Sequence, residues 1–110
     1  MSKKLTFSAN LYLSDSMYSQ KMDKLKKRLV ERPILTKVFL LTISTNPNEQ
    51  LDIIESKYLS FPYYNEHPLY VVGLAGSHGE AVALVEKIVQ DCLDKRGDVN
   101  LKTFLLEYKQ

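Results

Sequence analysis

LYVVGLAGSHGEAVALVEKIVQDCLDKRG, residues 69–97, carries the strongest structural pattern in the chain. Its first part, Leu69 to Leu74, is a short apolar run, which is typical of a strand buried in a sheet. Ser77 and Glu80 form a capping box, which predicts the start of a helix. Gly97 predicts the end of that helix, because glycine accepts the left-handed conformation that commonly follows a helix. A buried strand that leads into a long helix indicates an α/β protein.

The helix expected after Ser77 has one wide apolar face. Its apolar positions recur at helical spacing, and the only cysteine of the chain lies among them. They are Ala81, Val82, Val85, Ile88, Val89, Cys92 and Leu93. A thiol on such a face usually serves packing alone. Because a single cysteine cannot form an internal disulfide, we expect a reducing, cytoplasmic location.

The first third of the chain predicts a strand, a helix and a second strand. Leu5 to Leu13 alternates apolar and polar residues, which predicts a strand with two different faces. The apolar stripe of the following helix consists of Tyr18, Met22, Leu25 and Leu29. Pro33 should end this helix, because the residue before a proline avoids the α conformation. Lys37 to Ser44 is apolar with little alternation, so we expect a strand buried on both faces.

The residues after this second strand indicate another helix. Asn46 is a good helix cap, and Pro47 suits the first helical position. Leu51, Ile54 and Tyr58 then have the spacing of one helix face.

The elements therefore alternate β-α-β-α-β-α, in one α/β domain over residues 1–110. We predict a mostly parallel three-stranded sheet with strand order 2-1-3 and with helices packed on it. The polar face of the first strand favours an alternative, a two-layer α+β sandwich with a fourth, C-terminal strand. Residues 99–108 leave this choice open, although the spacing of Leu101, Phe104, Leu105 and Tyr108 favours a helix.

Composition narrows the class of protein further. The chain has 110 residues, of which 45% are apolar and 25% charged, and its net charge is +2. These values are ordinary for a soluble globular domain. The longest apolar run is too short to cross a bilayer, so no membrane partner is expected. Because no residues stand at metal-ligand spacing, neither a metal nor a cofactor is expected.

Polar residues follow each predicted strand. In a parallel sheet, the carboxyl ends of the strands meet at one edge, where α/β proteins commonly bind ligands. The residues expected there are Ser14, Asp15, Asn46, Gly76, Ser77 and His78. They predict a binding site for a small ligand or an anion. The alternative is that all of them serve as helix caps and turn formers.

No catalytic constellation is evident in the sequence. Ser77 and His78 are adjacent, and neighbouring side chains diverge at a helix start. The glycine spacing around them matches neither a dinucleotide-binding nor a phosphate-loop motif, and no nucleophile elbow is present. We therefore assign no catalytic residue and favour a non-enzymatic protein, while an enzymatic activity stays undecided.

The first predicted helix carries a basic face. Its cations at helical spacing are Lys21, Lys24, Lys27 and Arg28. Such a face can bind nucleic acid, although a solvated helix surface has the same composition. Nucleic acid is therefore an alternative partner.

Aromatic residues cluster before the third predicted strand. The aromatic residues expected at an interface are Tyr58, Phe61, Tyr63, Tyr64 and Tyr70. Tyr12 on the first strand is expected at the same interface. Tyrosine and phenylalanine are favoured in protein interfaces, because they bury a large area at low entropic cost. The leading hypothesis is a small interaction module or accessory subunit that binds a second copy of itself or another protein. The sequence names neither partner, ligand nor pathway.

Overall fold

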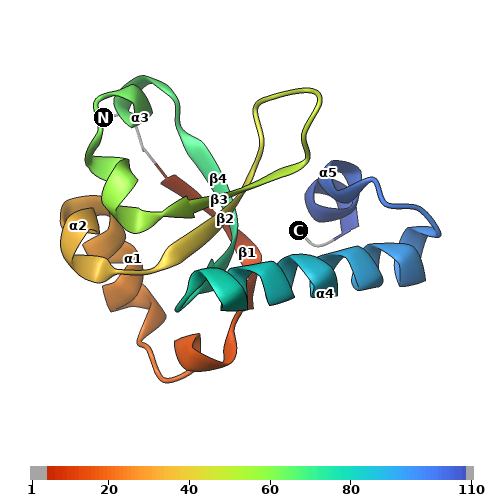
Figure 1. Cartoon of the computed structure of the whole chain (residues 1–110), viewed down its shortest axis with the longest axis horizontal. Helices are drawn as coiled ribbons and strands as arrows, with labels where there is room; N and C mark the ends of the chain where they lie inside the picture. The colour runs from red at the N-terminus through yellow and green to blue at the C-terminus, as the bar shows by residue number, and fades with distance from the viewer. Residues whose placement is uncertain (1–4, 109–110) are drawn as a thin grey trace.

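The computed structural model describes residues 5–108 as a four-stranded mixed sheet in the order β1-β4-β2-β3 (Figure 1). β1 (Leu5–Leu13) and β4 (Leu69–Ala75) run parallel. β2 (Phe39–Ile43) is antiparallel both to β4 and to β3 (Leu51–Glu55). The α/β character of the chain is thus confirmed, whereas the mostly parallel three-stranded sheet with order 2-1-3 is wrong.

The error arises at Asn46. Its side-chain Oδ1 accepts a hydrogen bond of 2.9 Å from the backbone N–H of Asn48, and its carbonyl oxygen accepts one of 3.1 Å from Glu49. The same side-chain chemistry can start a helix or a tight turn. Here it turns the chain back, so that residues 51–55 form β3 against β2 in place of the expected helix.

The alternative fold predicted a fourth strand at the C-terminus. The sheet does have four strands, but the additional strand lies elsewhere in the chain. The fourth strand is β3, and the C-terminal segment is helical: α5 spans Leu101–Thr103 and the π-helical turn η3 spans Phe104–Tyr108. Gln50 holds the start of this segment with both ends of its amide. Its Nε2 donates to the Val99 carbonyl at 2.8 Å, and its Oε1 accepts from the Leu101 N–H.

Two hydrophobic cores lie on opposite faces of the sheet. On one face, α4 (His78–Arg96) and the C-terminal helical segment pack around Ile88 and Phe104. On the other face, the core contains Leu25 and Leu29 of α1 and Leu59 of η2. This second face is covered by short elements (Figure 1): η1 (Asp15–Met17), α1 (Met22–Glu31), α2 (Pro33–Thr36), η2 (Ser56–Ser60) and α3 (Tyr63–Glu66).

Most element boundaries follow the sequence patterns. Ser77 caps α4 by accepting a 3.2 Å hydrogen bond from the Glu80 N–H, and Gly97 ends α4 with φ 77°. Both are as predicted, and α1 ends before Pro33. The expected apolar stripe of the first helix is partly wrong, because η1 intervenes before α1. Tyr18 is therefore 72% exposed, whereas Met17 is buried.

β2 is buried on both faces, as its sequence predicts. Leu41 belongs to the core under α4, and its neighbour Leu40 belongs to the opposite core. The burial arises because β2 lies between β4 and β3 in a mixed sheet. A parallel sheet is therefore not needed to explain an uninterrupted apolar strand.

Gly73 lies in β4, between the two neighbouring strands. A Cβ atom at this position would lie 3.2 Å from the Tyr12 carbonyl oxygen and 3.4 Å from the Leu41 Cβ. Both pairings of β4 change register beside Gly73, between Phe7 and Tyr12 of β1 and between Leu41 and Thr42 of β2. Glycine thus allows β1 and β2 to approach β4 closely at the bulges.

We expect Gly73→Ala to lower the free energy of unfolding by about 1–3 kcal/mol, because an added methyl group overpacks the sheet against backbone. Gly79→Ala is the matched control, since nothing lies within 4 Å of its added Cβ. It should be neutral or stabilising by about 0.5–1 kcal/mol, because alanine favours the helix. Urea unfolding measures both. Equal effects of the two substitutions would contradict the close approach at Gly73.

Candidate functional site

The parallel pairing of β1 and β4 brings two predicted strand-end loops together. The Ser14 N–H donates to the Leu74 carbonyl at 3.1 Å, and the Ser14 Oγ accepts from the Gly76 N–H at 3.2 Å. These bonds join the loop after β1 to the loop after β4. Ser14, Asp15, Gly76 and Ser77 thus meet at one edge of the sheet, as expected.

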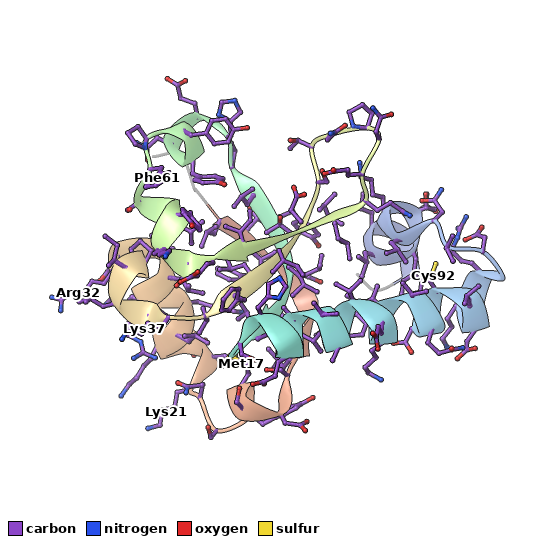
Figure 2. All side chains as sticks on the ribbon, in the orientation of Figure 1. Met17, Lys21, Arg32, Lys37, Phe61 and Cys92 are labelled. Carbon is purple, nitrogen blue, oxygen red and sulfur yellow. The ribbon has the colours of Figure 1, made fainter. Side chains whose placement is uncertain are left out.

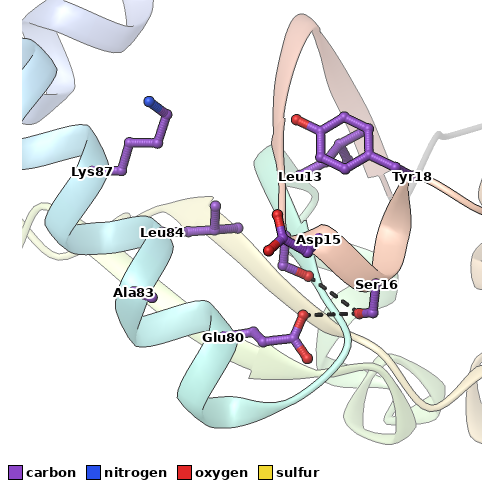
Figure 3. A pocket seen from close by; sticks show the side chains of 9 residues that line it. Leu13, Asp15, Ser16, Tyr18, Glu80, Ala83, Leu84 and Lys87 are labelled. Atoms are coloured by element: carbon purple, nitrogen blue, oxygen red, sulfur yellow. Dashed lines mark hydrogen bonds between the residues drawn. The ribbon is translucent and has the colours of Figure 1, made fainter.

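Three serines and a carboxylate form the centre of this junction, which we call the serine–glutamate cluster: Ser14, Ser16, Ser77 and Glu80. The Ser16 Oγ donates to Glu80 Oε1 at 2.8 Å, and the Ser77 Oγ lies 3.4 Å from Glu80 Oε2. The Ser14 and Ser16 hydroxyls are 3.4 Å apart (Figure 3). Hydrogen bonds from Ser14, Ser16 and Ser77 lower the pKa of the Glu80 carboxyl group.

The cluster is tightly fitted around Gly76. A Cβ atom at Gly76 would collide with the Ser16 Oγ, so glycine leaves the space in which Ser16 reaches Glu80. The Glu80 carboxylate already receives hydroxyl donors at the start of α4. An external anion at this helix end would have to displace Glu80 and would meet its charge. The cluster therefore joins the two loops, and this geometry does not favour anion binding.

Two residues of the predicted ligand site do not join the serine–glutamate cluster. β2 runs antiparallel to β4, so Asn46 follows β2 at the opposite edge of the sheet. This part of the expectation is wrong, because it assumed three parallel strands. His78 is exposed, and its ring makes an edge-to-face contact of 5.9 Å with Phe39. It does not join the hydrogen bonds of the serine–glutamate cluster.

An open depression of about 480 Å³ lies beside the cluster, between η1 and α4 (Figure 3). Asp15 and Tyr18 line it from the loop after β1, and Glu80 and Lys87 line it from α4. Sequence reasoning missed Tyr18, Glu80 and Lys87 as site residues. Glu80 and Lys87 stand two helical turns apart, so they share a face of the helix. That spacing could have indicated them.

The aromatic residues predicted to form an interface divide into two groups. Tyr12 is only 6% exposed and packs in the core under α4, where its hydroxyl donates to Asp91 Oδ2 at 2.6 Å. Its burial and Asp91 raise the pKa of Tyr12. Tyr64 and Tyr70 are half-buried, and burial also raises the pKa of Tyr64. None of these three is a predominantly exposed contact residue.

The other group is exposed, on elements that adjoin two exposed aliphatic residues in space or in the chain. α2 packs against η2, and α3 follows η2 closely in the chain. Five exposed side chains on these elements form what we call the apolar patch: Ile34, Leu35, Tyr58, Phe61 and Tyr63. The exposed fraction of Leu35 is 70%, and that of Phe61 is 53%. The rings of Tyr58 and Phe61 are in edge contact at 5.5 Å.

Sequence reasoning found the aromatic part of this surface but missed Ile34 and Leu35. The signal available was an apolar pair directly after Pro33, outside the stripe of the preceding helix. Whether such a pair faces the core or solvent depends on the packing of α2. Here Pro33 is buried, and the two residues after it are exposed.

The basic residues of α1 and the segment before it lie together as predicted. Lys21, Lys24, Lys27 and Arg28 line one hollow of about 430 Å³ with Ser19 and Gln20. All four cations are exposed, and we call them the basic face. Arg28 Nη2 donates to Gln20 Oε1 at 3.4 Å. Binding of nucleic acid by this face stays a prediction.

Comparison with family models, with curated proteins and with solved structures finds no match to this chain.

Among residues 5–108, no group of three or more histidine, cysteine, aspartate or glutamate side chains is placed to hold a metal ion. No helix in the same range is long and apolar enough to span a bilayer. Cys92 is buried, and this burial raises the pKa of its thiol.

We expect Ser16→Ala to move the pKa of Glu80 upward, toward its ordinary value of 4.5, because one hydroxyl donor to the carboxylate is lost. NMR titration of the Glu80 carboxyl carbon measures this change. Ser19→Ala is the control, since the Ser19 hydroxyl donates to the Ser16 carbonyl and not to Glu80. A Glu80 pKa unchanged by Ser16→Ala would contradict the hydroxyl contribution.

The lowered pKa of Glu80 makes the stability of the fold depend on pH. The Glu80 pKa is lower in the folded protein than in the unfolded chain. The cluster therefore stabilises the fold fully at pH values above the ordinary pKa of 4.5. This contribution is lost as the pH falls through the lowered pKa. Acidification should therefore reduce the stability difference between the wild type and Ser16→Ala.

Proposed function

We propose that the protein is a non-enzymatic protein-binding module and that the apolar patch is its binding surface. The observation that carries the proposal is the gathering of five large exposed apolar side chains on adjoining short elements. Contiguous apolar surfaces with aromatic residues are typical of the central part of a protein interface.

The elements that carry the apolar patch are anchored by other residues. Pro33 of α2 and Leu59 of η2 are buried. The backbone N–H of Ser56 donates to the Val38 carbonyl at 2.8 Å, and the Ser56 Oγ accepts from the Val38 N–H at 3.2 Å. The exposed side chains are therefore presented from an ordered surface. Such ordering reduces the entropy lost when a partner binds.

Photocrosslinking in cells of the source organism tests this proposal. A benzoyl-phenylalanine residue replaces Leu35 or Phe61 in the full chain, and each position should give a protein adduct of the same discrete mass. Leu93 on α4 is the control position, because it is also exposed, at 41%, and lies outside the apolar patch. Tyr58→Ala should reduce the adduct at position 35 by about thirtyfold, as expected for loss of an interface aromatic worth roughly 2 kcal/mol.

Two results would contradict the proposal. The first is equal adduct formation at position 93 and at positions 35 and 61, which would indicate random collision. The second is the absence of any protein adduct at positions 35 and 61.

A small-ligand site in the depression beside the serine–glutamate cluster is the second candidate function. The observation that favours it is the placement of an aromatic ring, a carboxylate and an ammonium group around one hollow, from Tyr18, Asp15 and Lys87. Groups of both charges suit a small molecule that itself carries both charges.

Native mass spectrometry of the protein purified from its own cells tests this second candidate. A retained ligand should add a discrete mass, which Lys87→Ala removes and Lys95→Ala on the same helix preserves. The bare polypeptide mass in the wild type would contradict a retained ligand. The same spectrum reports the number of subunits and thus tests whether the protein binds a second copy of itself.

A further inference from the structure

The surroundings of the apolar patch are strongly basic. Residues 21–37, which form α1, α2 and their flanks, carry seven basic and two acidic residues, whereas the whole chain has a net charge of only +2. Lys21, Lys37, Arg32 and Phe61 follow one side of the molecule (Figure 2). Ile34 of the apolar patch lines a hollow together with Lys37, Lys57 and Glu55, and Glu55 is paired with Lys57. The apolar patch thus continues into a positively charged surface.

The cations of residues 21–37 form no ion pair within the described range. Within the described range, the ion pairs are Lys57–Glu55 at 3.8 Å and Arg96–Asp98 at 3.0 Å. Neither involves a cation of residues 21–37. One cation of this segment, Lys26, lies over the Phe7 ring, 5.2 Å from its centroid. An excess of cations over acidic residues produces a positive potential that favours an anionic partner.

We infer that the partner of this module is an acidic polypeptide segment with apolar side chains, which dock on the apolar patch while its carboxylates face the basic face. This inference rests on the proposed function and specifies the chemistry of the partner. Ile34 and Leu35 are 59% and 70% exposed, so the partner must supply apolar groups as well as negative charge. A polypeptide with acidic and apolar residues supplies both.

A second copy of the chain fits this surface less well. A two-fold symmetric dimer places the same patch of both subunits face to face. It would bring two positively charged surfaces together, and juxtaposed like charges oppose association. The charge distribution therefore favours a different, acidic chain.

Nucleic acid also fits less well. Phosphate groups would suit the cations of α1, but a nucleic acid would leave the aliphatic side chains of Ile34 and Leu35 without an apolar counterpart.

The test is a selection of short random peptides that bind the full-length protein, followed by measurement of their Kd by fluorescence anisotropy. We expect the enriched peptides to combine net negative charge with leucine or aromatic residues. Raising the salt from about 50 to about 300 mM should weaken their binding, because salt screens exposed charges.

Three double variants separate the contributions of charge and of apolar contact to peptide binding. K24E/R28E reverses two cations of the basic face, and L35S/F61S removes two apolar anchors. Each should raise the Kd by at least about tenfold. K95E/K102E changes the net charge as much as K24E/R28E does, but on α4 and α5, and should leave the Kd within about twofold of the wild type, since distant exposed charges are screened. Circular dichroism verifies that all three variants are folded.

The outcomes distinguish this inference from the proposed function. If the enriched peptides carry apolar residues without net negative charge and bind K24E/R28E like the wild type, the acidic partner is wrong and the protein-binding module stands. If no peptide is enriched but adducts form at positions 35 and 61, the acidic segment is wrong and the protein-binding module stands; if neither peptides nor adducts are found, both are wrong. If no peptide binds, while duplex DNA or phosphatidylserine vesicles bind the wild type but not K24E/R28E, the partner is a nucleic acid or an anionic membrane.

Discussion

The position of β4 between β1 and β2 is the constraint on which the rest of the structure depends. Its two neighbours can approach it because Gly73 leaves space against the Tyr12 backbone and the Leu41 side chain. Pairing parallel to β1 joins the loops that carry Ser14 and Gly76. Pairing antiparallel to β2 sends Asn46 to the opposite edge. One strand thus determines which polar residues meet.

The two faces of the sheet differ in how completely they are closed. On one face, the long helix α4 and the C-terminal helical segment cover the core, and Gln50 holds that segment at its start. On the other face, short elements around α1, α2 and η2 cover the core. Short elements bury few of their side chains, so Leu35 and Phe61 stay exposed. The proposed binding surface thus exists because short elements, rather than one long helix, cover this face of the sheet.

Local patterns predicted the elements whose signals have a single interpretation. The capping box at Ser77 and the glycine at position 97 bounded α4 correctly, because both act through backbone geometry within one turn. Asn46 misled the prediction, because a side-chain acceptor that suits a helix start also suits a hairpin turn. The helix-like spacing of Leu51 and Ile54 occurs in β3, where Ile53 and Ile54 pack against opposite cores.

Local sequence patterns were sufficient to predict the α/β class, the buried strands β2 and β4, α4 with its cap, and the basic face of α1. These depend on interactions between residues close in the chain. The tertiary structure alone decided the strand order, the exclusion of Asn46 from the strand-end cluster, the burial of Tyr12 and the exposure of Ile34 and Leu35. These depend on which distant strands pair and on how much surface each short helix can bury, and neither is encoded in local spacing.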